Sequence, residues 1–73
     1  MEKNFFAKIN NSNAEYTLYF GDKKNLEEFE KMVSNCINNP KKYTSVIYTG
    51  IDEQTVFPAK FLNESVITFS KSE

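Results

Sequence analysis

The sequence has no histidine, no tryptophan, no arginine and a single cysteine among its 73 residues. Without histidine, the chain cannot form a Ser-His-Asp triad, a histidine acid–base pair or a zinc site with imidazole ligands. The lone Cys36 excludes an internal disulfide and a metal site made only of cysteines. Two glycines are too few for a glycine-rich phosphate-binding loop. We therefore expect no catalytic residues, no cofactor and no metal, and a protein that is not an enzyme.

Long apolar runs are also missing. No N-terminal stretch has the length of a signal peptide, and none approaches the roughly 20 residues that span a bilayer. We expect no membrane association. The unpaired Cys36 is typical of a reducing compartment, which favours a cytoplasmic location. Lysine without arginine, together with abundant asparagine and isoleucine, is the usage of an AT-rich genome, such as that of a low-GC bacterium or its phages.

The apolar residues that are present favour a sheet. They make up 40% of the chain, and most are aromatic or β-branched, with seven phenylalanines and four tyrosines. These side chains suit a pleated, half-buried surface. A chain this short has a small core and no disulfide or metal to reinforce it, so a partner subunit is the remaining natural source of stability.

Two strands and a turn are predicted at the N-terminus. Residues 4–10 and 14–20 each alternate between two faces, and Asn11-Ser12-Asn13 joins them with turn-forming residues. Such a pair is typical of a β-hairpin. One face of the hairpin is apolar, and we expect the other to carry Phe6, Lys8, Thr17 and Tyr19.

An amphipathic helix is predicted over residues 22–38. Its apolar stripe has helical spacing and comprises Leu26, Phe29, Val33, Cys36 and Ile37. Asp22 is the expected N-cap, with Asn25 as a competing cap, and Pro40 ends the helix. Because Cys36 lies on the stripe and near the helix C-terminus, which disfavours a thiolate, we interpret it as a small buried hydrophobe.

Three further short strands are expected over residues 44–49, 55–57 and 65–70, with one helical turn at 58–62. The resulting order, β-β-α-β-β-β, predicts an α+β fold: a small antiparallel sheet with one helix packed on one face. A small, partly open β-barrel capped by the helix is the alternative. We expect residues 1–73 to form a single domain.

The acidic residues fall into two groups. Glu27, Glu28 and Glu30 lie in the predicted helix, and Asp52 and Glu53 lie in a turn between strands. Neighbouring carboxylates on a helix diverge, so they do not converge on a metal ion or a reacting group. We interpret the helix acids as a solvated face and Asp52-Glu53 as a hairpin turn.

The aromatic residues exceed what one helix and one small sheet comfortably bury. We therefore predict a small, non-enzymatic protein-binding module that masks a partner surface through its open sheet face or through the edge at Ser65–Ser70. A regulator or inhibitor encoded by a phage or mobile element fits this description, and the partner is another protein, a second copy in a homodimer, or both. The candidate partner-binding residues are Phe6, Lys8, Tyr19, Lys41, Lys42 and Tyr43.

Two other functions compete with this prediction. An open sheet with lysines and aromatics also suits single-stranded nucleic acid, through Lys8, Tyr19, Lys41, Lys42 and Tyr43. The formal charge of −1 and the absence of arginine argue against it. A structural or assembly component is the third candidate. The ten acidic residues permit the mimicry of phosphates that nuclease inhibitors use, although nine lysines dilute that idea.

Overall fold

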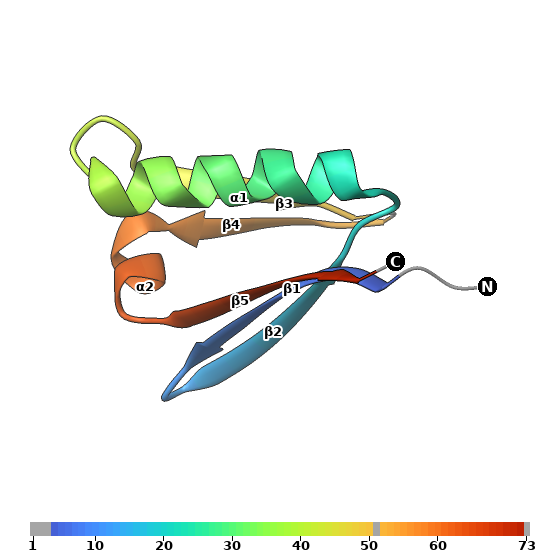
Figure 1. The fold of residues 1–73 in the computed structure, drawn as a ribbon. Coiled ribbons are helices and arrows are strands. Elements are labelled where there is room, and N and C mark those ends of the chain that lie inside the picture. The colour runs from blue at the N-terminus through green and yellow to red at the C-terminus, as the bar shows by residue number, and fades with distance from the viewer. Residues whose placement is uncertain (1–3, 51, 73) are drawn as a thin grey trace.

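The computed structural model describes residues 4–50 and 52–72. Along the chain run β1 (Asn4–Asn11), β2 (Ala14–Tyr19), α1 (Lys23–Asn38), β3 (Ser45–Thr49), β4 (Gln54–Pro58), α2 (Ala59–Asn63) and β5 (Val66–Ser72) (Figure 1). The predicted order of strands and helix is confirmed, and the helical turn predicted at 58–62 is α2. Ile51, in the turn between β3 and β4, lies outside the described residues.

The described strands form two antiparallel sheets. Strands β2, β1 and β5 form a three-stranded sheet in that order, and β3 pairs only with β4. The fold is thus α+β, as predicted, but the expected single sheet is divided and the described strands close no barrel. A physical reason lies in Pro58, which has no N–H to continue a ladder and leads directly into α2. The chain therefore turns away from β4 before β5 begins and joins β1.

The core lies between the three-stranded sheet, α1 and the β3–β4 hairpin (Figure 1). Its buried members are Phe5, Ala7, Ile9, Leu18, Leu26, Phe29, Val33, Cys36, Val46, Phe57, Ala59 and Leu62. The strand residues of this set confirm the predicted alternation in β1, and the helix residues confirm the apolar stripe except for Ile37, which is exposed. Among the described residues no buried side chain is polar or charged.

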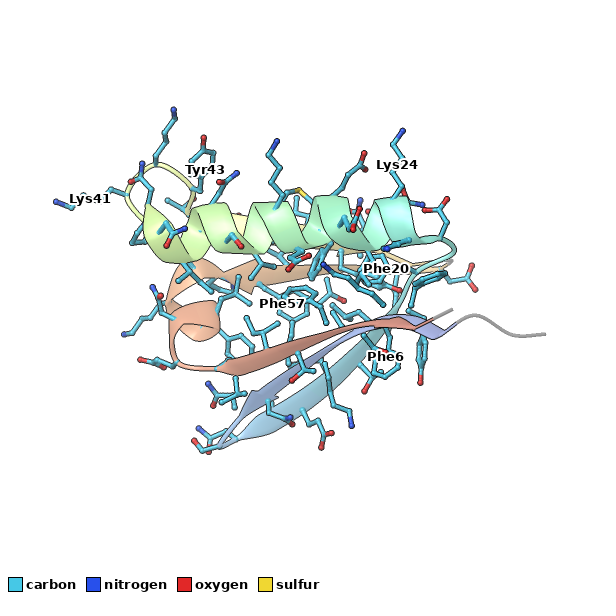
Figure 2. The ribbon with its side chains drawn as sticks, viewed as in Figure 1. Phe6, Phe20, Lys24, Lys41, Tyr43 and Phe57 are labelled. Carbon is cyan, nitrogen blue, oxygen red and sulfur yellow. The ribbon has the colours of Figure 1, made fainter. Side chains whose placement is uncertain are left out.

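Side chains rather than backbone pairing connect the two sheets. Phe57 of β4 lies between α1 and the three-stranded sheet (Figure 2), with its ring centroid 5.3 Å from that of Tyr16 on β2. The Tyr48 hydroxyl of β3 donates a hydrogen bond of 2.9 Å to the Tyr19 carbonyl at the end of β2. The arrangement of the two sheets therefore depends on a few aromatic contacts.

The start of α1 is fixed by Asp22. Its side-chain oxygen accepts a hydrogen bond of 2.8 Å from the Asn25 backbone N–H. Of the two N-cap residues that the sequence allowed, Asp22 and Asn25, Asp22 is thus the cap. The helix ends at Asn38, and the Asn39 carbonyl then accepts hydrogen bonds from the backbone N–H groups of Lys42 and Tyr43, at 3.2 and 2.9 Å. This turn sets the direction in which the chain leaves the helix.

We expect Asp22→Ala to lower the free energy of unfolding by about 1 kcal/mol, because it leaves an N-terminal N–H of α1 without its acceptor. Urea unfolding followed by circular dichroism measures the change. Asp22→Asn is the matched control, since asparagine caps a helix about as well as aspartate. Equal losses in the two variants would contradict the capping role.

Candidate protein-binding surface

The six candidate residues lie in two places, far apart. Phe6 pairs with Tyr19 across β1 and β2, and Lys8 follows on the same face of the three-stranded sheet. The loop of Lys41, Lys42 and Tyr43 follows the C-terminus of α1 instead. Tyr19 comes just before α1, and the 16 residues of the helix span about 24 Å. Lys41 and Phe6 accordingly lie at opposite ends of the molecule (Figure 2).

The outer face of the three-stranded sheet is mostly polar. It carries two aromatic rings at one end, those of Phe6 and Tyr19, with centroids 6.0 Å apart. Tyr19 is 69% exposed, whereas Phe6 is only partly exposed. The cross-strand register places on the same face Lys8, Asn10, Glu15, Thr17, Val66, Thr68 and Ser70. The surplus of aromatic surface on this face is therefore confined to the neighbourhood of Tyr19.

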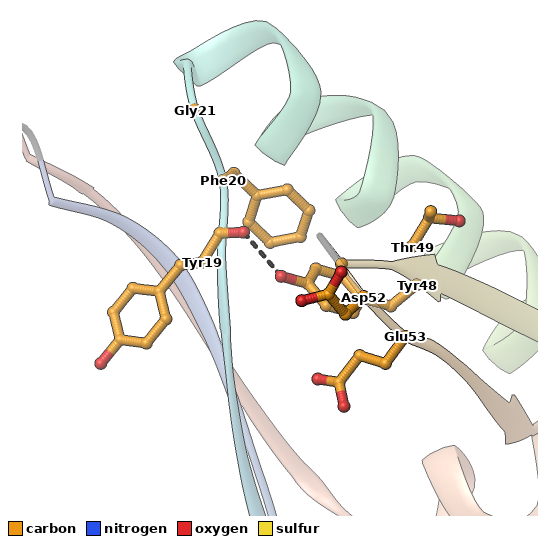
Figure 3. A pocket seen from close by; sticks show the side chains of 8 residues that line it. Tyr19, Phe20, Gly21, Tyr48, Thr49, Asp52 and Glu53 are labelled. Carbon is orange, nitrogen blue, oxygen red and sulfur yellow. Dashed lines mark hydrogen bonds between the residues drawn. The ribbon is translucent and has the colours of Figure 1, made fainter.

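A cleft of about 920 Å³ opens beside Tyr19, between the end of β2 and the β3–β4 turn (Figure 3). Its aromatic wall is held in place, because the ring of Phe20 packs edge-on against Tyr48 at 5.5 Å and at a tilt against Phe29 at 5.3 Å. The hydrogen bond from Tyr48 to the Tyr19 carbonyl crosses the space between the strands. The side of the cleft formed by Phe20 and Tyr48 is therefore held in place by packing.

Two carboxylates lie in the wall of this cleft. The Gly50 backbone N–H donates a bond of 2.7 Å to the Glu53 carbonyl, which confirms the predicted turn and places Asp52 and Glu53 at its tip. Figure 3 shows both carboxyl groups extending from the turn toward β2. No basic side chain is among the described residues that line the cleft. Aromatic faces beside unneutralised carboxylates make an environment that favours a cationic group.

The loop after α1 has a different character. The Lys42 ammonium lies 5.4 Å from the centroid of the neighbouring Tyr43 ring, in a local cation–π contact. Lys41 and Lys42 are exposed, and Lys41 projects away from the sheet (Figure 2). The structure thus does not bring Lys41, Lys42 and Tyr43 together with Lys8 and Tyr19. The residues of the nucleic-acid hypothesis form no continuous basic and aromatic surface.

Cys36 lies in the core, as predicted. It is 1% exposed, and desolvation raises the pKa of its thiol, so that the protonated form is favoured. Within residues 4–50 and 52–72, no three histidine, cysteine or acidic side chains are grouped closely enough to hold a metal ion. In the same part of the chain, no helix is long and apolar enough to cross a membrane.

Sequence reasoning missed the cleft because a turn motif does not reveal what it faces. Asp52 and Glu53 are turn residues, as expected, but their position opposite the end of β2 follows from the packing of the β3–β4 hairpin. The one available signal was the absence of any lysine between Tyr43 and Pro58. Comparison of the chain with protein-family models, curated protein sequences and solved structures gives no significant match. The function is therefore argued from the chemistry of these surfaces.

Proposed function

We propose that the chain is a small, non-enzymatic protein-binding module whose contact surface is the cleft beside Tyr19. The observation that carries this proposal is that the Asp52 and Glu53 carboxylates face the aromatic wall of Phe20 and Tyr48. The Tyr19 ring, which is 69% exposed, adds an aromatic surface on the outer side of β2 at the rim of the cleft. Exposed aromatic rings supply much of the binding energy at protein interfaces, especially where the surrounding wall is rigid. The Phe6 ring supports Tyr19 from the sheet side.

The partner is a protein that presents a basic side chain. An arginine or lysine entering the cleft stacks against Phe20 or Tyr48 and pairs with Asp52 or Glu53. By occupying basic residues of its partner, the module masks them, as a regulator or inhibitor does. A cytoplasmic site of action and an origin in a phage or mobile element complete this proposal. They rest on the unpaired Cys36 and on the use of lysine without arginine, respectively.

Nucleic acid is the less favoured ligand. The carboxylates beside Tyr19 repel phosphate groups, and the exposed Lys41 and Lys42 lie beyond the other end of α1. No feature of the described surface specifically favours a structural or assembly component.

A titration of the ¹⁵N-labelled protein with a hexa-arginine peptide tests the cleft, with chemical shifts of backbone amides as the readout. We expect saturable shifts at Tyr19, Thr49, Gly50 and Glu53. The double variant Asp52→Asn/Glu53→Gln is expected to weaken this binding at least tenfold, or about 1.4 kcal/mol.

The matched control is Glu27→Gln/Glu28→Gln, which changes the net charge equally on the exposed side of α1. An equal loss in this control would mean that the peptide responds only to net charge, and would contradict the cleft. Shifts around Lys41 and Lys42 with oligothymidylate, without any shift in the cleft with the peptide, would favour the nucleic-acid alternative.

A further inference from the structure

Strand β3 has one edge without a hydrogen-bonding partner among the described residues. Two backbone hydrogen bonds lie at the two ends of its pairing with β4: the Gly50 N–H donates to the Glu53 carbonyl, and the Ala59 N–H donates to the Thr44 carbonyl. In an antiparallel ladder, every second residue of a strand bonds to the same neighbour. Since Thr44 and Gly50 bond toward β4, Val46 and Tyr48 also direct their backbone groups toward β4. Ser45, Ile47 and Thr49 direct theirs to the opposite, open edge. The β3 edge is thus a row of available donors and acceptors.

The other open strand edges carry features that hinder pairing. On β5 the open edge includes Lys71, which forms an ion pair of 2.7 Å with Glu30 of α1. On β4 it includes Pro58, which has no N–H, and on β2 it includes the charged Glu15. The β3 edge has neither a charge nor a proline. It is therefore the edge best suited to accept another strand.

An uncharged groove follows this edge, between β3 and α1. Two adjoining cavities of about 240 and 360 Å³ form it and share Met32 and Ile47. None of the described residues that line them is charged, in a chain that is 26% charged. Apolar side chains stand exposed along it: Met32 is 44%, Tyr43 39% and Ile47 51% exposed. A strand that docks here must itself be free of charge, because a charge in such a groove would lose its hydration without gaining a partner.

The β3 strand meets this requirement, since its sequence Ser-Val-Ile-Tyr-Thr is uncharged. We propose that the chain forms a symmetric dimer in which β3 pairs antiparallel with β3 of a second copy. A two-fold axis at Ile47 makes the two Ile47 residues exchange both N–H to C=O bonds, and it sets Ser45 opposite Thr49. The product is one four-stranded sheet in the order β4-β3-β3-β4, with Met32, Tyr43 and Ile47 covered. The groove adjoins the proposed cleft, because Tyr19, Tyr48 and Thr49 line both, but the dimer does not depend on the function proposed for that cleft.

Sedimentation equilibrium from micromolar to millimolar protein tests the dimer, together with amide hydrogen exchange in the unmodified chain. We expect a concentration-dependent dimer, and protection of the Ile47 amide that rises with dimer fraction. The Val46 and Tyr48 amides, already bonded to β4, are expected to change far less. A chain that stays monomeric throughout, or a dimer whose Ile47 amide remains unprotected, overturns the proposal.

Ile47→Lys places a charge on the open edge and is expected to weaken the dimer at least tenfold. The matched control is Val56→Lys, because Val56 is the cross-strand neighbour of Ile47 and is similarly exposed, at 55%. It lies on β4, away from the pairing edge, and is expected to leave the dimer intact. Equal urea midpoints for the two variants, measured at a protein concentration low enough for both to be monomeric, establish that both fold. A dimer weakened equally by both substitutions would place the interface elsewhere.

Discussion

Leu26→Ala is expected to lower the free energy of unfolding by about 2–5 kcal/mol. Leu26 is completely buried where α1 packs on the core, and alanine leaves a cavity that the surrounding side chains fill only in part. A chain of this length has a total stability of about 4–11 kcal/mol, so the variant is expected to be close to unfolding at 25 °C. Urea denaturation monitored by circular dichroism measures the loss.

Ile37→Ala is the control for Leu26→Ala, because Ile37 lies in the same helix and is 40% exposed. Its expected cost is about 1 kcal/mol or less, since a large part of the side chain is already in water and its removal leaves no enclosed cavity. If the two substitutions lower the free energy of unfolding equally, the assignment of the core-facing side of α1 is wrong.

Phe57→Ala is expected to cost about 3–5 kcal/mol. Besides filling core volume, its ring contacts Tyr16 edge-on at 5.3 Å and stacks against Phe61 at 6.1 Å, so one side chain connects β4, β2 and α2. Because the two sheets share no backbone ladder, the loss is expected to loosen their packing as well. Urea unfolding gives the stability, and near-ultraviolet circular dichroism of the tyrosines reports the packing.

The control for Phe57 is its neighbour in the same strand, Val56→Ala, whose side chain is 55% exposed. We expect it to cost no more than about 1 kcal/mol, the scale of β-propensity differences. A near-ultraviolet signal that Phe57→Ala leaves unchanged would show that the aromatic cluster does not hold the sheets together.

The elements near each other in sequence were predictable because local patterns specify them. Alternation around Phe5 and Ile9 predicts β1, helical spacing from Leu26 to Cys36 predicts α1, and Pro58 marks the end of β4. Even the interpretation of Cys36 as a core residue followed from its place on the helical stripe. In each case the deciding neighbours lie within a few residues.

The arrangement of these elements was not predictable in the same way. The pairing of Ile9 with Ile67 joins residues far apart in the chain, and no local pattern specifies it. The division into two sheets depends on where α2 redirects the chain after Pro58. The candidate residues split for a similar reason, since the length of α1 carries Lys41 away from Tyr19. Which residues share a surface is therefore a property of packing rather than of spacing.

The wholly apolar core has a consequence for how such a chain can change over time. Within the described residues, no buried hydrogen bond or ion pair between side chains demands a particular pair of residues inside. Apolar interiors tolerate exchanges that conserve volume, such as leucine for methionine, and lose little stability. Homologues of this chain are thus free to change the identity of their core residues while the pattern of apolar and polar positions is kept. Their relationship is therefore better preserved in the fold than in the sequence.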